Sequence, residues 1–198
     1  SIDDFICYCH RQGININNDN VISLNYLSYE YQVPRLINIT DIYIKEHQTE
    51  LALQYFTFYK DINNEDNERK EDFMACYFLH HINDEKLLSF QVPSLYRILN
   101  KFLNNHKNDN DFEKKKIFSV LIPFLFKCLD LHGRKASVLF SGIDLSNCNY
   151  EYLYRLLNEY SNVFDFHFIN STMMKTNYEL QNEFIQKELK IEDSIHCK

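Results

Sequence analysis

The fold is decided near the start of the chain, where residues 5–47 read FICYCHRQGININNDNVISLNYLSYEYQVPRLINITDIYIKEH. Apolar residues recur at helical spacing over residues 2–10, 21–31 and 34–44. Gly13 suits the left-handed residue that ends a helix, and Ile14 and Ile16 alternate with Asn as in a short strand. Val33-Pro34 separates the later helices, because proline fits the first turn of a helix and not its interior. The segment therefore predicts three helices and one short strand.

Composition favours helices for the rest of the chain as well. The protein has 198 residues, of which 45% are hydrophobic and sixteen are Phe, so it can bury a substantial core. It contains only three Gly and three Pro, too few for the many turns of an all-β fold. We expect an all-α protein with at most one or two short strands.

The same spacing predicts further helices beyond residue 48. They are expected at residues 50–59, 72–82, 93–103, 111–132, 134–140 and 150–160, with polar loops at 61–70 and 104–111. Residues 163–169 alternate like a short strand, and residues 171–190 form a last helix with charged faces. Its apolar positions are sparse, as in a partly exposed or coiled-coil helix; they are Met173, Leu180, Phe184 and Ile191.

Charge and cysteine content exclude several classes of protein. The formal net charge is −7, whereas a nucleic-acid face needs clustered Lys and Arg. The one basic run, Lys114-Lys115-Lys116, reads as a solvated helix face. No apolar run reaches the roughly 20 residues that cross a bilayer, and six unevenly spaced cysteines indicate reduced thiols. We expect a cytoplasmic protein that binds neither nucleic acid nor membrane.

Three Cys-His groups are the candidates for chemistry. They are Cys7-Tyr8-Cys9-His10, Cys76 with His80 and His81, and Cys128 with His132. A structural zinc site needs four ligands, usually from paired knuckles, and a Cys-His nucleophile needs an orienting group. Neither pattern is complete, and core thiols with surface histidines explain the same residues. We therefore expect no catalytic residue, metal or cofactor, and no enzyme; a zinc-binding module that uses the Cys-His pairs is the weaker alternative.

Aromatic residues and one arginine suggest an interaction surface. Tyr150, Tyr154 and Arg155 share the helix predicted at residues 150–160, and Tyr and Arg are typical anchors of protein interfaces. Leu180 and Phe184 supply apolar positions on the last predicted helix. These five residues are the candidate interaction surface.

The order of elements resembles a known interaction family. Phe5 to Tyr8, Gly13, Ile14 to Ile16, Asn20 to Leu24, Tyr31 to Val33, Leu36 and Tyr43-Ile44 resemble the last third of a BTB (POZ) domain. Residues 49–160 resemble the helical BACK segment that follows it in adaptor proteins, most closely where Leu87-Leu88 leads into Val92 to Leu99. Residues 127–137 and 164–168 look like uncharacterised protist proteins in which this unit precedes ankyrin repeats or a coiled coil.

This resemblance implies an architecture and a function. It implies an antiparallel helical array with a BTB-like part at 1–48, a BACK-like part at 49–160 and a C-terminal part at 161–198. The implied function is a non-catalytic scaffold or adaptor, in one form an adaptor of a cullin-3-type ubiquitin ligase. The family's dimer interface and much of its cullin-3 surface lie in the first two thirds of the BTB domain, which this sequence lacks. Cullin-3 binding is therefore expected if the chain is a fragment of a protein that supplies this part, and not expected if the parent protein lacks it. The alternative is a self-associating coiled-coil protein, hence a homo-oligomer.

Overall fold

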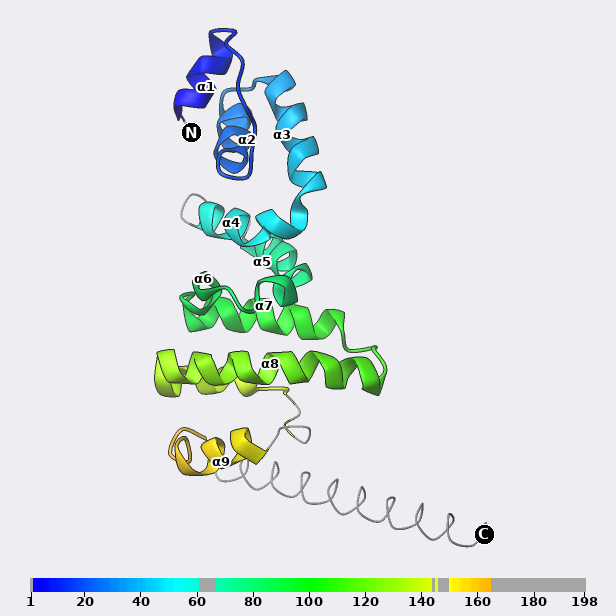
Figure 1. Cartoon of the computed structure of the whole chain (residues 1–198), viewed down its shortest axis with the longest axis vertical. Coiled ribbons are helices and arrows are strands. Elements are labelled where there is room, and N and C mark those ends of the chain that lie inside the picture. Colours follow the sequence, from blue (N-terminus) through cyan, green and yellow to red (C-terminus); the bar gives the residue numbers. More distant parts are fainter. Residues whose placement is uncertain (1, 61–66, 144, 146–149, 165–198) are drawn as a thin grey trace, which may run out of the picture. The chain divides into compact units, whose positions relative to one another are not determined.

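The computed structural model describes residues 2–60, 67–143, 145 and 150–164, and these form two compact units (Figure 1). The first unit combines Ser1–Leu87 with Pro93–Asn105. The second combines Leu88–Val92 with His106–Lys198, of which the described residues end at 164. The boundaries expected at residues 48 and 160 stay predictions.

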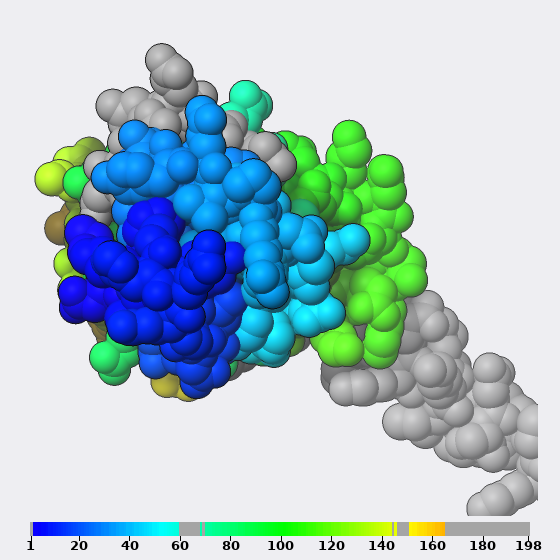
Figure 2. Space-filling model, turned by 90° about the horizontal axis from the view of Figure 1, so that it is seen from above, coloured from blue at the N-terminus to red at the C-terminus, as the bar shows by residue number. Residues whose placement is uncertain are grey.

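The first unit is built from short helices packed in chain order. Their bounds are Ile2–Cys9 for α1, Val21–Glu30 for α2, Pro34–Glu46 for α3, Gln48–Lys60 for α4, Asn67–Cys76 for α5, Phe78–His81 for the 3-10 helix η1, Glu85–Leu88 for α6 and Val92–Asn105 for α7. Helix α2 contacts α1, α3 and α4, and α4 contacts α5. Figure 2 shows α1 lying beside α2 and α3 on one face of this unit.

The core of the first unit forms where apolar faces meet. Val21, Ile22 and Leu51 are buried, and side chains from α3 and α4 pack against them, namely Tyr43, Ile44, Tyr55, Phe58 and Tyr59. A second buried group joins η1 to α7 through Phe78 and Phe102, whose ring centroids lie 5.2 Å apart. Burial of such apolar area, at roughly 25 cal/mol per Å², drives the packing.

The second unit is organised around one long helix. Helix α8 is Asp111–His132, the 3-10 helix η2 is Gly133–Phe140, and α9 is Tyr150–Asn158. Asn110 caps α8 by accepting a hydrogen bond from the Glu113 amide at 3.0 Å. Gly133 ends α8 at a φ of 58°, a left-handed conformation that favours glycine. The helix continues through Pro123.

The all-α class is confirmed, and several local predictions are wrong. Residues 14–16 belong to neither a helix nor a strand, the Asn15 carbonyl accepts a hydrogen bond from the Asn20 side-chain amide at 2.9 Å, and the described residues contain no strand. The left-handed residue after α1 is Arg11, at a φ of 60°, because the chain turns two residues before Gly13. The predicted strand at 163–169 begins as a turn at residues 163–164, and the rest of it lies outside the described residues with the predicted helix at 171–190.

The central helices also differ from the expected bounds. Helix α5 begins at Asn67, inside the predicted charged loop, and ends at Cys76 instead of continuing to Ile82. The chain then tightens into η1, so that Phe78 and His81 both turn inward. The predicted helix at 134–140 is a 3-10 helix, which follows the left-handed turn at Gly133 directly. Tertiary packing overrides helical spacing at both places.

Candidate interaction surfaces

Arg155, a candidate anchor, holds α9 to α8. Its guanidinium donates to Asp130 Oδ1 at 2.7 Å and to Glu159 Oε2 at 2.9 Å, and it lies over the Phe126 ring at 5.3 Å from the centroid. The Tyr160 hydroxyl also bonds to Asp130. The hydrogen bond to Glu159 and the nearby Asp130 carboxylate raise the pKa of Arg155 above its ordinary value, so the side chain stays charged. Arg155 therefore acts as a link within the second unit.

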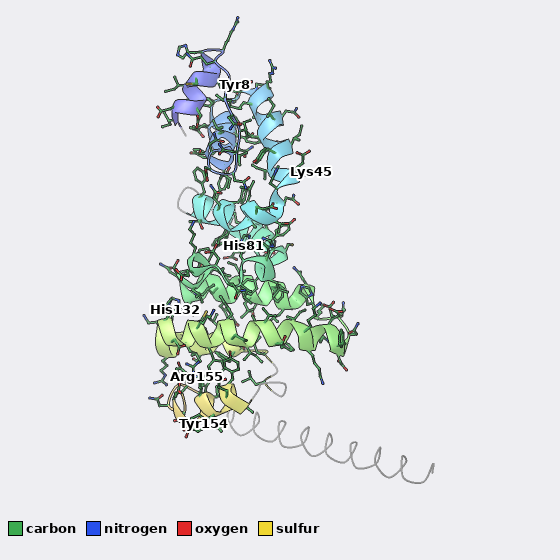
Figure 3. All side chains as sticks on the ribbon, viewed as in Figure 1. Tyr8, Lys45, His81, His132, Tyr154 and Arg155 are labelled. Atoms are coloured by element: carbon green, nitrogen blue, oxygen red, sulfur yellow. The ribbon has the colours of Figure 1, made fainter. Side chains whose placement is uncertain are left out.

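Tyr154 occupies the opposite side of the same helix. Figure 3 shows Arg155 directed from α9 toward α8 and Tyr154 directed away from it. The Tyr154 side chain is 53% exposed, which leaves it accessible to a partner. Tyr150 begins α9, but its side chain is not among those described. Leu180 and Phe184 lie outside the described residues. The five candidates are thus not brought together as one surface by the described part of the chain.

A more extensive apolar surface lies at the start of the first unit. Helix α1 contains no buried residue, and Ile2 and Ile6, one turn apart, are 64% and 48% exposed. Tyr31, just after α2, is 65% exposed, and its ring centroid lies 5.4 Å from that of Phe5. We call Ile2, Phe5, Ile6 and Tyr31 the α1–α2 patch. Contiguous exposed apolar side chains of this kind are typical of interaction sites.

Sequence reasoning located only half of this patch. The spacing placed Phe5 and Ile6 on one side of the first helix, which is where they lie. It placed Tyr31 among the apolar residues of the helix predicted at residues 21–31, whereas α2 ends at Glu30 and Gln32 turns the chain at a φ of 52°. The dipeptide Val33-Pro34 was the signal that the helix stops early.

A groove of about 450 Å³ lies along α4 in the first unit. Its lining is mixed and consists of the carboxylates Asp19, Glu50 and Asp84, the basic or polar side chains Lys86, His81, Gln54 and Thr57, and the apolar side chains Leu53 and Phe58. His81 bonds through Nε2 to the Thr49 carbonyl at 2.7 Å, so its imidazole is already used to join η1 to α4. The groove offers polar contacts but no nucleophile paired with a base among the described residues.

The Cys-His groups are not assembled into a metal centre. Within residues 2–60, 67–143, 145 and 150–164, no three His, Cys, Asp or Glu side chains converge closely enough to hold a metal ion. Cys76 ends α5 and is exposed, whereas His80 and His81 belong to η1, so the predicted one-turn spacing on a single α-helix is wrong. His132 bonds through Nε2 to the Leu88 carbonyl at 2.8 Å.

We predict that Cys128 resists alkylation in the folded protein. The side chain is buried in α8, and burial raises its pKa to about 12, so almost no thiolate exists near pH 8. Peptide mass spectrometry after iodoacetamide treatment should show Cys9 and Cys76, which are exposed, modified under native conditions, and Cys128 modified only in denaturant. Equal modification of Cys128 and Cys76 in the native protein would contradict this.

None of the described helices combines the length and the apolar character needed to cross a bilayer. No protein-family model matches the chain, and no curated protein and no solved structure matches it. The surfaces above are therefore the basis for assigning a function.

Proposed function

We propose that this chain is a non-catalytic protein–protein interaction scaffold or adaptor of the cytoplasm. The observation that carries the proposal is the α1–α2 patch, where α1 leaves Ile2 and Ile6 exposed beside Phe5 and Tyr31. Leaving these apolar side chains in water is unfavourable, and a partner that covers them recovers the hydrophobic free energy. The patch lies in the segment that resembles a BTB domain.

The order of elements supports the BTB- and BACK-like interpretation. Helix α1, the turn after it, helix α2, the Val33-Pro34 step and helix α3 follow in the order that the resemblance implies, although residues 14–16 form no strand. In one form of the proposal, the partner is cullin-3 and the protein is an adaptor of a ubiquitin ligase. In the broader form, the partner is another protein that offers a complementary apolar surface.

We expect Ile6→Glu to weaken partner binding about tenfold or more, because it places a charge in the centre of a desolvated contact. The first measurement is the affinity of the full chain for the purified N-terminal region of cullin-3. Ile42→Glu is a matched control, since Ile42 lies on α3 and is 49% exposed, against 48% for Ile6. The control should bind like the wild type.

Two results separate the forms of the proposal. If cullin-3 does not bind the wild-type chain, the ligase form is wrong and the broader form is tested by affinity purification from the source cells. In the broader form, one protein should be retained by the wild-type chain and by Ile42→Glu but not by Ile6→Glu. The same protein, once purified, should bind the purified wild-type chain again. Identical sets of retained proteins for all three chains would contradict docking at the α1–α2 patch.

A further inference from the structure

One face of α8 carries a line of exposed apolar and basic side chains. We call this face the α8 row, and its members are Phe112, Lys116, Val120, Pro123, Lys127 and Leu131. Phe112, Val120 and Leu131 are 75%, 42% and 60% exposed, and both lysines are exposed between them. Successive members are four, four, three, four and four residues apart, which places all of them within an arc of about 100° around the helix.

The core of the second unit uses the other side of α8. Leu121, Leu125 and Leu129 lie opposite the α8 row and are at most 1% exposed. The apolar members of the row are therefore not needed to build this core, and they remain in contact with water. A continuous stripe of exposed apolar side chains is typical of an interaction site.

The α8 row is positively charged, although the chain has a net charge of −7. Lys115 is exposed beside its two lysines, and among the described residues none of the three forms an ion pair. Glu113 and Asp130 lie at its edges. Asp130 accepts a hydrogen bond from the Arg155 guanidinium at 2.7 Å, so its charge is already balanced within the unit. A surface that complements the row is therefore both apolar and acidic.

The charges disfavour two other occupants of the row. Two antiparallel copies of α8 would place Lys116 of one copy opposite Lys127 of the other, and two parallel copies would place each lysine opposite itself. Like charges repel at both positions. An anionic bilayer would meet the whole negatively charged chain, whereas a helix about 10–12 Å across contacts the row alone.

We propose that the α8 row binds an amphipathic helix of a partner protein, in which acidic residues alternate with apolar ones. Intervals of three and four residues are those at which one helix packs along another. Nineteen residue steps separate Phe112 from Leu131, so the partner helix covers about 29 Å. Its apolar residues bury those of the row, and its carboxylates pair with Lys116 and Lys127. This contact does not use the α1–α2 patch and goes beyond the proposed scaffold function.

Binding of a synthetic helix to the full chain tests this contact. The probe, called the Glu peptide, is labelled with fluorescein and has about 22 residues, enough for an Ala-rich helix. It carries Leu, Glu, Leu, Leu, Glu and Leu at the intervals of the α8 row, with Ala and Gln elsewhere. The order of apolar and charged members is the same in both directions, so the peptide fits the row either way. In a second probe, the Lys peptide, Lys replaces both Glu residues.

Fluorescence anisotropy should show the Glu peptide binding the wild-type chain at least about tenfold more tightly than the Lys peptide, which places like charges opposite each other. Val120→Asp should weaken binding of the Glu peptide about tenfold, because it buries a carboxylate among apolar side chains. Val138→Asp is the matched control, since Val138 lies on η2 and is 41% exposed, against 42% for Val120. The control should bind like the wild type.

A charge reversal tests the role of the lysines. The double variant Lys116→Glu/Lys127→Glu should bind the Lys peptide more tightly than the Glu peptide. Lys45→Glu/Lys107→Glu changes the net charge equally at two exposed lysines outside the row and should keep the wild-type preference. Ile6→Glu should keep it as well, because the peptide does not use the α1–α2 patch.

Three outcomes would overturn the proposal. The first is equal binding, or no binding, of the two peptides by the wild-type chain. The second is loss of the Glu peptide in Ile6→Glu, which places it on the α1–α2 patch. The third is sedimentation of the wild-type chain with phosphatidylserine vesicles that Val120→Asp abolishes, without binding of the Glu peptide, which assigns the row to a lipid surface.

Discussion

Replacing Phe126 by Ala is expected to lower the free energy of unfolding of the second unit by about 3–5 kcal/mol, the usual cost of truncating a buried aromatic residue. Phe126 is 1% exposed, and its ring lies 4.9 Å from that of Tyr152 and 5.6 Å from that of Phe140. It therefore joins α8 to both η2 and α9. The Arg155 guanidinium rests on the same ring, so the change also removes the support of the α8–α9 ion pair.

Urea unfolding followed by circular dichroism measures this loss. Because the chain has two compact units, the loss should appear as a lower urea midpoint for the transition of the second unit, with the transition of the first unit unchanged. Tyr154→Ala provides the comparison, because it removes an aromatic side chain that is 53% exposed from the same unit. It should cost less than about 1 kcal/mol. Equal losses for the two variants would show that Phe126 is not the central packing residue of this unit.

Replacing Asn25 by Ala is expected to destabilise the first unit by about 2–3 kcal/mol, because it breaks a buried polar network. The Asn25 amide donates to Thr40 Oγ1 at 2.9 Å and to Asp41 Oδ1 at 2.8 Å, which joins α2 to α3. The Tyr59 hydroxyl of α4 donates to Asn25 Oδ1 at 3.5 Å. Without the amide, the Tyr59 hydroxyl and one oxygen of the Asp41 carboxylate lose that partner.

The matched control for this change is Asn38→Ala. Asn38 lies on the exposed side of α3, and the same substitution there should change the free energy of unfolding by about 0.5 kcal/mol or less. The measurement is again the urea midpoint of the first unit's transition. A loss for Asn25→Ala as small as that for the control would mean that the network contributes specificity of packing and little stability.

The helical class could be predicted because it depends on features that short segments carry themselves. The scarcity of Gly and Pro and the helical spacing of apolar residues are local properties. Pro34 likewise marks the start of α3, which begins at this residue. The ends of elements were less predictable where tertiary contacts decide them. Phe78, which is fully buried against Phe102, ends the α-helical pattern at Cys76 although the sequence continues it.

The candidate interaction surface shows the same difference between what local sequence predicts and what tertiary contacts decide. The pattern that identified Arg155 as an interface anchor holds no information on Asp130, which lies 25 residues earlier and meets it only in the folded unit. The exposure of Phe112, Val120 and Leu131 on α8 could not be predicted either, because only the folded unit shows which face of this helix is buried.

The short segment Leu88–Val92 has a consequence for how this protein is made and cut. It belongs to the second unit, where His132 holds the Leu88 carbonyl, yet it precedes the last helix of the first unit in the chain. No single cleavage of the backbone can separate the two units intact. During synthesis on the ribosome, Phe90 emerges before the rest of its unit, which resumes at His106, so the nascent chain carries this aromatic residue before the unit that buries it exists.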